Sequence, residues 1–327
     1  MAKQLQVTIV GAGRYGRELI APKYANNSSC FIKAVIDPLV SGKLLAKGVL
    51  GSIPLCGSAA EWLDTHGRPD AGDLFELAVH YDALPGLLEE LSRAGAKNFV
   101  LPKPVALDDK TLAYIKKLQK KFKLNYAISS QWHYSEVTRL VGKCIQDMKK
   151  GGECMRVKFN FSQFFSHEQL KHYSSRTALF PHILEIIYST ELSDFKKVKV
   201  QVKKISNSYL NCVIALGSVM TIEILSDLRA KEKARSMEAG SMKVDFLASF
   251  KDGAAVKYPS VVYRGKTTKI KEDNLRVMVG VVVSAFLRYA NIAEDKKVLT
   301  LEKYNPIAEF QVFLESNLRP GNYVFNG

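Results

Sequence analysis

The sequence predicts an α/β chain in two parts: a doubly wound parallel sheet, followed by an α+β domain with an open, mostly antiparallel sheet. In residues 1–128, short apolar runs alternate with segments of helical apolar spacing, the pattern of a parallel sheet covered by helices. In residues 129–327, strand-like runs follow one another with little helix between them, which is typical of an antiparallel sheet. The 327 residues are enough for two cores, and we place the boundary between residues 128 and 129.

The first part is expected to alternate strictly between strands and helices. Expected strands are Val7–Val10, Phe31–Ile36, Asp73–Val79, Asn98–Leu101 and Asn125–Ile128. Expected helices are Arg17–Ala25, Ala59–Thr65, Leu84–Ala94 and Asp108–Phe122. Pro22 limits the first of these helices because proline has no backbone N–H to donate.

The second part is expected to be rich in strands. Met155–Phe165 alternates polar and apolar side chains, as a strand with one buried face does. Further expected strands are Val198–Ile205, Asn211–Ala215, Val219–Leu225 and Val244–Phe250. Expected helices are Ala178–Thr190, Glu272–Asn291 and Leu301–Asn317. The charged stretch Arg229–Ala239 is expected to be a mobile loop.

Composition and charge indicate which partners and which cellular location to expect. The net charge of +15 favours anionic partners, but no recognisable nucleic-acid module is present and we expect no nucleic-acid partner. No apolar run is long enough to cross a bilayer and the N-terminus has no secretory pattern, so we expect no membrane partner and a cytoplasmic location. The five cysteines are widely spaced without a CxxC pair, which predicts reduced thiols and no metal site.

The stretch LQVTIVGAGRYG leads an apolar run directly into Gly11, Gly13 and Gly16. This is the spacing of the dinucleotide-binding fingerprint of Rossmann sheets: a tight turn, a close approach of the pyrophosphate and close packing of helix on strand. We count Arg14 and Tyr15 with the glycines as cofactor-binding residues. The alternative is a glycine turn in an unrelated α/β domain.

Asp37 ends the second expected strand, 21 residues after Gly16, near the spacing of a carboxylate that binds the adenosine ribose. Such a carboxylate accepts hydrogen bonds from the ribose hydroxyls and repels a 2′-phosphate. The cofactor is therefore expected to be NAD or NADP, with NAD slightly favoured, while Arg14 keeps NADP open. The alternative for Asp37 is a turn residue before Pro38.

The chain resembles the Gfo/Idh/MocA family of NAD(P)-dependent oxidoreductases in three motifs. These are GAGRYG, VIDP at the end of the strand Phe31–Ile36, and KNFVLPKPVAL around the strand Asn98–Leu101. The resemblance implies a Rossmann domain over residues 1–128 and a substrate-binding and oligomerisation domain over residues 129–327. It also implies a homodimer or homotetramer. The motif-level likeness is confined to about the first 130 residues.

The chain departs from the family pattern at two positions. Pro102 stands where the family usually has Glu in its Glu-Lys-Pro motif, so that only Lys103 and Pro104 match. In the second domain His182 matches the family's His, but Ala178 replaces the Asp four residues earlier. Polyol dehydrogenases of the family use that Asp and His together, so an ordinary polyol substrate is in doubt.

The resemblance assigns the candidate catalytic residues. Lys103 would polarise a carbonyl or imine and contact the cofactor with Pro104, and His182 would carry a proton. Tyr134, in the segment SSQWHYSE, is a further candidate proton donor, with interface packing as its alternative. His80 would lie near the nicotinamide ribose.

These residues predict hydride transfer between a nicotinamide cofactor and a small polar substrate: a ketone, imine or secondary alcohol derived from a sugar or amino acid. The positive charge favours an anionic or carrier-bound substrate. The alternative is a dinucleotide-binding sensor without turnover, or an accessory subunit of a biosynthetic enzyme.

Overall fold

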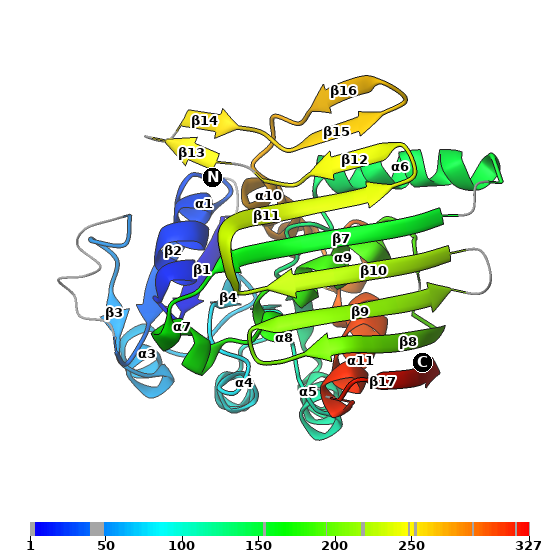
Figure 1. Cartoon of the computed structure of the whole chain (residues 1–327). Helices are drawn as coiled ribbons and strands as arrows, with labels where there is room; N and C mark the ends of the chain where they lie inside the picture. Colours follow the sequence, from blue (N-terminus) through cyan, green and yellow to red (C-terminus); the bar gives the residue numbers. More distant parts are fainter. Residues whose placement is uncertain are drawn as a thin grey trace. The chain divides into compact units, whose positions relative to one another are not determined.

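The structure is a computed structural model that describes residues 4–39, 49–152, 155–193, 195–216, 220–247, 249–251, 254–289, 291–317 and 319–326. The chain divides into two compact units (Figure 1). The first comprises Met1–Gln131 and Leu275–Ala308, and the second comprises Trp132–Asn274 and Glu309–Gly327. Each unit has its own sheet and its own buried core.

A six-stranded sheet forms the centre of the first unit, in the order β3-β2-β1-β4-β5-β6. Its strands are β1 (Leu5–Val10), β2 (Cys30–Ile36), β3 (Leu55–Cys56), β4 (Asp73–Leu77), β5 (Asn98–Leu101) and β6 (Asn125–Ile128). All pairs are parallel. The doubly wound parallel sheet predicted from the sequence is thereby confirmed, and every carboxyl end of a strand lies at the same edge.

Helices follow β3, β4 and β5 in the first unit. They are α3 (Ala59–His66), α4 (Leu84–Arg93) and α5 (Asp109–Phe122). Ser58 and Asp108 cap α3 and α5 by accepting the backbone N–H of Glu61 and Thr111.

The helix expected over Arg17–Ala25 differs from its prediction. It starts as a π-helix, η1 (Tyr15–Ile20), and continues as the short α1 (Ala21–Ala25). Ala21 N–H donates to the carbonyl of Gly16, five residues back. Pro22 lacks an N–H, so the carbonyl of Glu18 has no α-helical partner at this point. Such wide turns occur most often at functional sites.

A late segment of the chain returns to the first unit. It contains α10 (Asn274–Arg288), the 3₁₀ turn η2 (Ile292–Glu294) and the first half of α11 (Leu301–Ser316). Thr300 bridges Ala127 of β6, and Ile128 N–H donates to the carbonyl of Leu299 at 2.9 Å. The segment therefore covers β6, which is the edge strand of the sheet.

A nine-stranded sheet forms the second unit, in the order β16-β15-β12-β11-β7-β10-β9-β8-β17. Its strands are β7 (Met155–Phe164), β8 (Lys197–Ile205), β9 (Tyr209–Leu216), β10 (Met220–Asp227), β11 (Arg229–Ala239), β12 (Met242–Asp245), β15 (Ser260–Tyr263), β16 (Lys266–Lys269) and β17 (Gly321–Asn326). A separate hairpin joins β13 (Ser249–Lys251) to β14 (Ala254–Lys257). Only β7 and β10 pair in parallel, which confirms the predicted mostly antiparallel sheet.

This unit contains α6 (Glu136–Lys150), α7 (His167–His172), α8 (Ser175–Ala178) and α9 (Phe180–Ser189), together with the second half of α11. The sequence analysis missed α6, although Val137, Val141 and Ile145 recur at helical spacing behind the capping residue Ser135. Helix α9 packs on β7, and α8 packs on β9 and β10. One face of the sheet is thus covered by helices.

Two predictions about the strands were wrong. The stretch Arg229–Ala239 is not a loop but β11, one of the longest strands of the sheet. The single strand expected over Val244–Phe250 is instead the end of β12 and the start of β13. Residue 219 of the strand expected over Val219–Leu225 lies outside the described residues.

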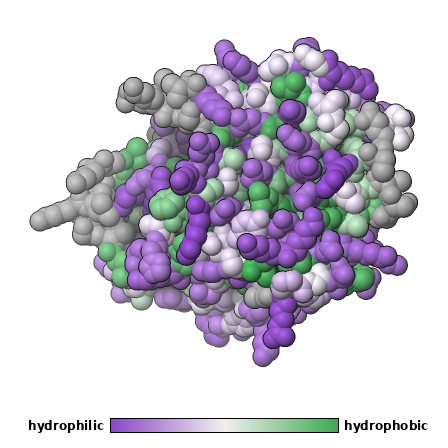
Figure 2. All heavy atoms as spheres, in the orientation of Figure 1, coloured by the Kyte–Doolittle hydropathy of each residue, from purple (hydrophilic) through white to green (hydrophobic). Residues whose placement is uncertain are grey.

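The other face of the sheet carries polar and mostly basic side chains, seen in purple in Figure 2. Arg156 and Lys158 of β7 alternate with buried neighbours and are exposed. Glu223 of β10 forms ion pairs with Arg156 and with Lys203 of β8, both at 3.1 Å. These pairs lower the pKa of Glu223, first through its hydrogen bond with Lys203.

The described part of the chain contains four cysteines, all buried and free, and Cys154 lies outside it. No helix among the described residues is long and apolar enough to span a membrane. Within the same residues, no group of three or more His, Cys, Asp and Glu side chains is arranged to hold a metal ion.

Candidate functional site

The candidate cofactor residues gather at the carboxyl edge of the parallel sheet. Gly11 follows β1, Asp37 follows β2, His80 lies three residues after β4 and Lys103 two residues after β5. Ligands of open parallel sheets bind at this edge, where the strand order reverses. Here the reversal falls between β1 and β4, beside Gly11.

The three glycines of the loop differ in what a side chain would meet. Gly11 has a φ of +93°, and a Cβ there would lie 2.5 Å from the carbonyl oxygen of Ala78 after β4. A Cβ on Gly16 would collide with the carbonyl oxygen of Gly11. A Cβ on Gly13 would meet no atom within 4 Å. Gly11 and Gly16 are therefore required by the fold, whereas Gly13 leaves open space beside the backbone.

Asp37 connects the end of β2 to the glycine loop. Its Oδ2 accepts the backbone N–H of Ala12 at 2.7 Å, and its Oδ1 accepts that of Leu39 at 2.8 Å. A carboxylate has about four lone-pair sites, so each oxygen keeps acceptor capacity. The side chain is half-buried. This geometry ties the glycine loop to the end of β2.

Tyr15 and Arg14 begin the wide helix after the glycines. The Tyr15 hydroxyl hydrogen-bonds the Ser129 hydroxyl at 2.7 Å, which joins the loop to the end of β6. Arg14 is exposed, and its Nε lies 3.4 Å from Oε2 of Glu18. The Arg14 guanidinium thus remains at the surface beside the glycine loop.

His80 lies among polar and aromatic neighbours at the same edge. Its Nδ1 is 3.1 Å from Oδ2 of Asp82, and its ring lies 4.0 Å from that of Tyr81, centroid to centroid. The ring is partly exposed at the sheet edge.

Lys103 is half-buried in the turn after β5, and the Lys103–Pro104 peptide bond is cis. Pro104 itself is buried. The turn therefore places a lysine at the carboxyl end of β5, one strand away from β4 in the sheet.

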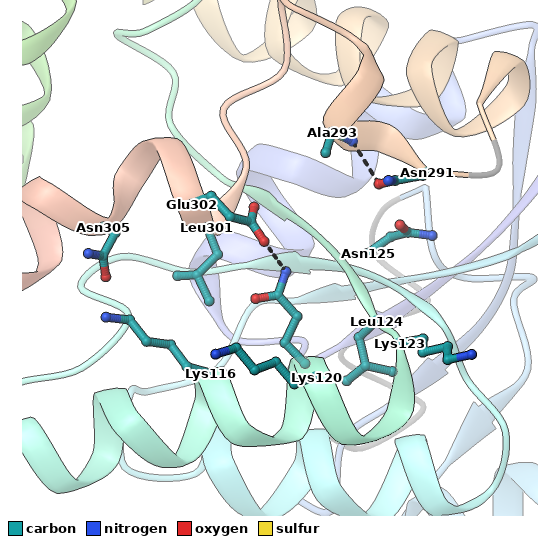
Figure 3. A pocket seen from close by; sticks show the side chains of 11 residues that line it. Lys116, Lys120, Lys123, Leu124, Asn125, Asn291, Ala293, Leu301, Glu302 and Asn305 are labelled. Carbon is teal, nitrogen blue, oxygen red and sulfur yellow. Dashed lines mark hydrogen bonds between the residues drawn. The ribbon is translucent and has the colours of Figure 1, made fainter.

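The first unit also contains a cavity of about 760 Å³ that lies away from this edge (Figure 3). Its wall includes Lys116 and Lys120 of α5, and Asn125, the first residue of β6. Gln119 and Glu302 are joined across it by a hydrogen bond of 2.7 Å. Because Asn125 opens β6 rather than ending it, the cavity lies toward the amino ends of the strands. Its volume alone does not make it the cofactor site.

In the second unit, His182 on α9 is bound by Trp132. The indole Nε1–H donates to Nδ1 of His182 at 3.1 Å. Oε2 of Glu185 is 3.8 Å from the same Nδ1, too long for a hydrogen bond. Indole is only a donor, so Nδ1 must accept, and a neutral His182 then carries its proton on Nε2.

Glu185 has no exposed surface and holds the segment that carries Trp132. Its Oε1 accepts the backbone N–H of Trp132 at 3.0 Å and that of His133 at 3.4 Å. A buried carboxylate that accepts backbone N–H groups is compensated for its lost hydration. Glu185 therefore positions the segment that carries the donor of His182.

Tyr134 is only 6% exposed and lies edge-on to His133, with ring centroids 5.0 Å apart. His133 in turn pairs its Nδ1 with Oγ of Ser189 at 3.0 Å. Tyr134 and His182 belong to the second unit, whereas Lys103 belongs to the first.

Sequence reasoning did not predict the hydrogen bond between Trp132 and His182. The two residues are 50 positions apart, and no local pattern links them. The replacement of the family's Asp by Ala178 was the available signal, because a His that loses one partner can acquire another.

No protein-family model matches the sequence, and no curated protein matches it either. Solved structures do. UDP-N-acetylglucosamine 3-dehydrogenase from Acidithiobacillus ferrooxidans is 18% identical, with a TM-score of 0.67 and 97% of each chain covered. An oxidoreductase from Agrobacterium radiobacter in complex with NAD⁺, L-tartaric acid and magnesium is 12% identical, with a TM-score of 0.71 and 98% of each chain covered.

A 3-ketoreductase from Actinomadura kijaniata, in complex with TDP-benzene and NADP, is 11% identical, with a TM-score of 0.73 and 97% of each chain covered. The chain has the two-domain fold of these oxidoreductases. The resemblance to Gfo/Idh/MocA proteins is confirmed at the level of the fold.

Proposed function

We propose that the chain is an NAD(P)-dependent oxidoreductase that acts on a small polar substrate. The observation that carries this proposal is the glycine loop. Gly11 and Gly16 have no room for a side chain, while Gly13 faces open space at the reversal point of the sheet. The fold alone requires only the outer two glycines, so the middle one is explained by a ligand that approaches the backbone.

In this proposal the edge residues bind and orient the dinucleotide, which supplies or accepts the hydride when bound. Gly13 admits the pyrophosphate, and Asp37 receives the adenosine ribose with the acceptor capacity left on its oxygens. NAD is favoured over NADP because the Asp37 carboxylate would repel a 2′-phosphate. His80 and Lys103 line the edge on the nicotinamide side.

The proton chemistry falls to Lys103 and His182. The Lys103 ammonium stabilises negative charge that develops on a carbonyl oxygen. His182 holds its proton on Nε2 because Trp132 donates to Nδ1, so Nε2 is a hydrogen-bond donor. A donor suits protonation of an oxygen during reduction, and we infer that reduction of a ketone or imine is the favoured direction. Tyr134 is kept as a second proton donor.

The substrate class follows from the neighbours and from charge. One neighbour is a dehydrogenase of a UDP-sugar, and another was solved with L-tartaric acid. A sugar-derived or carboxylated substrate fits both and agrees with the net charge of +15. A cytoplasmic location and assembly as a homodimer or homotetramer belong to the same proposal. The open face of the nine-stranded sheet is the surface available for self-association.

A second candidate function is a dinucleotide sensor or accessory subunit without turnover. Pro102 and Ala178 favour it, because both replace acidic residues that the family uses for chemistry. A spectrophotometric nicotinamide assay over ketones, imines and sugar-derived alcohols separates the two functions. Turnover with any of these substrates contradicts the pure sensor.

The experiment that tests the cofactor site is the substitution Gly13→Val. We expect the affinity for NAD(H) to fall by about 100-fold or more, because the branched side chain fills the space of the pyrophosphate. Thermal unfolding should stay near that of the wild type, because Gly13 is exposed and its Cβ meets nothing. Unchanged NAD(H) titration in folded Gly13→Val protein would remove the proposed function.

A further inference from the structure

We propose that Arg235 binds an anionic group of the substrate, a carboxylate or a phosphate, on the inner face of the nine-stranded sheet near His182. The proposal rests on the oxidoreductase function proposed above and adds the substrate class. It assigns a role to β11, the strand that the sequence analysis took for a loop.

Arg235 is a partly buried cation of the second unit, and the neighbours that it contacts are neutral. Its Nη2 donates to Oε1 of Gln163 at 2.9 Å, and its guanidinium carbon lies 5.0 Å from the ring centroid of Phe161. Nη1 is sealed from solvent and has no hydrogen-bond partner among the described residues. Burial lowers the pKa of Arg235 to about 10, so the group is still charged at neutral pH.

A charge in this setting needs an explanation. No ion pair among the described residues includes Arg235, whereas Arg156 on the neighbouring strand β7 is exposed and pairs with Glu223 at 3.1 Å. A buried charged donor without an acceptor is destabilising. Such groups in native proteins are typically satisfied by a ligand or serve a function. The Arg235 Nη1 group can therefore donate to a ligand, and the acceptor that fits a guanidinium best is an anionic oxygen group.

The inner face of the sheet links Arg235 to His182 through aromatic rings. Phe161, under the guanidinium, lies 5.9 Å from Phe246, and Phe246 lies 5.2 Å from Trp132, centroid to centroid. Trp132 donates its indole N–H to His182. All five residues belong to the second unit. This series of ring contacts has a charged group at one end and a proton donor at the other, which suits a substrate that binds by an anionic end and reacts at its other end.

The strand that carries Arg235 is shaped irregularly just before it. Arg229 pairs with Phe164 and Ala234 pairs with Ser162, so β11 has extra residues opposite β7 over this stretch. Oγ of Ser162 donates to the carbonyl of Glu232 inside the irregular part. Bulges of this kind re-aim side chains next to active sites. Regular pairing resumes at Ala234, immediately before Arg235.

The test titrates two anionic probes, malonate and inorganic phosphate, into the full-length protein by calorimetry at constant ionic strength. Arg235→Met removes the charge and keeps an apolar chain over Phe161. Arg156→Met, on the exposed face of the neighbouring strand, is the matched control. We expect saturable binding of at least one probe to the wild type and to Arg156→Met, and a loss of about 10- to 100-fold in Arg235→Met.

The stronger of the two probes identifies the group, a dicarboxylate for malonate or a phosphoryl group for phosphate. The proposal is overturned if the wild type binds neither probe saturably, or if Arg235→Met binds as well as Arg156→Met. A thermal melt of Arg235→Met establishes that the variant is folded, and Arg235→Gln replaces it if it is not.

The same three proteins are titrated with NADH in parallel. Because Arg235 lies in the second unit, its substitution should leave NADH affinity within about twofold. If none of the three proteins binds NADH, the proposed function is contradicted. If all three bind NADH but anion binding is unchanged by Arg235→Met, only this inference is contradicted.

Discussion

Gly13 differs from Gly11 and Gly16 in the reason for having no side chain. Gly16→Val would drive a side chain into the carbonyl of Gly11 and should prevent stable folding, whereas Gly13→Val should fold and fail only to bind. The sequence spacing could predict that three glycines matter, because each glycine is unusual in itself. It could not separate a steric requirement from a ligand requirement, since that depends on Ala78, which lies 67 residues after Gly11.

Asp37 is expected to discriminate between the two nicotinamide cofactors. Asp37→Asn keeps a carbonyl oxygen that can accept the Ala12 N–H, so the loop should hold, but removes the charge that repels a 2′-phosphate. We expect the ratio of NADP to NAD affinity to rise by about 10-fold, the scale of one charge-dependent hydrogen bond. Fluorescence titration with NADH and NADPH measures it, with the exposed Asp64→Asn as control. An equal loss for both cofactors would make Asp37 a turn residue.

Lys103 is expected to matter more for turnover than His182. Lys103→Ala should lower kcat by roughly 10²-fold, the usual scale for a positioned acid or charge stabiliser, with little change in NADH affinity. His182→Ala should lower kcat less, because its usual acidic partner is replaced by Ala178. Lys97→Ala is the matched control, since Lys97 precedes β5 where Lys103 follows it and donates to the carbonyl of Phe122.

The catalytic assignment of Lys103 is tested by comparing the kcat values of these variants. A kcat for Lys103→Ala equal to that of Lys97→Ala would leave Lys103 as a surface residue of a rigid turn. Trp132→Phe adds a readout for the positioning of His182: it removes the indole donor to Nδ1, so the pH dependence of kcat should change while the edge-on ring contact with Phe246 is kept.

At the scale of elements, β11 shows why charge misled the sequence analysis. Arg229–Ala239 contains six charged side chains in eleven residues, which favours a solvated segment by composition. The strand forms nevertheless, because Met237 and Ala239 are buried on its inner face and β7 supplies a pairing edge. The low intrinsic β-propensity of β11 is outweighed by its pairing with the neighbouring strand and by the burial of its inner face. By contrast β5 and β6 were predicted to the residue, because parallel strands buried on both faces read as continuous apolar runs.

The core of the six-stranded sheet contains a carboxyl group that should make stability depend on pH. Glu76 of β4 has no exposed surface; Oε2 accepts the hydroxyl of Tyr24 at 2.7 Å, and Oε1 has no partner among the described residues. Burial raises the pKa of Glu76 from 4.5 to about 8, against the smaller opposite effect of the Tyr24 hydrogen bond.

The direction in which pH changes the free energy of unfolding depends on whether the folded or the unfolded chain keeps the proton of Glu76. Below pH 4.5 the group is protonated whether the chain is folded or unfolded, so pH has no effect through it. Between pH 4.5 and about 8 only the unfolded chain releases the proton, and the free energy of unfolding falls by about 1.4 kcal/mol per pH unit. Above pH 8 both states are ionised and the fall stops.

Glu76→Gln should abolish this dependence while keeping an acceptor for Tyr24. Relative to the wild type, the variant should gain stability steadily between pH 5 and pH 8, by a few kcal/mol in total. Urea unfolding at three pH values measures the difference, with Glu90→Gln on the exposed side of α4 as control. If Glu76→Gln and wild type change in parallel with pH, the carboxyl is ionised in the folded protein.

At the scale of the whole molecule, the first unit is discontinuous in sequence. A fragment of residues 1–131 contains all six strands but lacks residues 275–308, and so exposes the edge of β6 that Leu299 and Thr300 cover. We expect this fragment to aggregate or unfold without cooperativity, because an uncovered edge strand pairs with other chains. Joining residues 275–308 to it through a flexible linker should restore a cooperative melt by circular dichroism and NADH binding.

A cooperative, dinucleotide-binding 1–131 fragment would contradict that expectation. The composition of the sequence could suggest two cores, but not that the chain returns to the first one. A returning segment carries the same apolar helical pattern as any other helix, and its destination is set by contacts with β6 that are about 170 residues away in sequence.

The return of residues 275–308 to the first unit delays the completion of that unit during synthesis. The ribosome delivers the glycine loop and all six parallel strands early, but the segment that covers β6 emerges only after every strand of the nine-stranded sheet except β17 has been made. At about 5–20 residues per second, the nascent first unit waits roughly ten to thirty seconds with its edge open. During that interval the edge of β6 is uncovered, so we expect the cellular yield to depend on translation speed through the second unit as well as on the final stability of each unit.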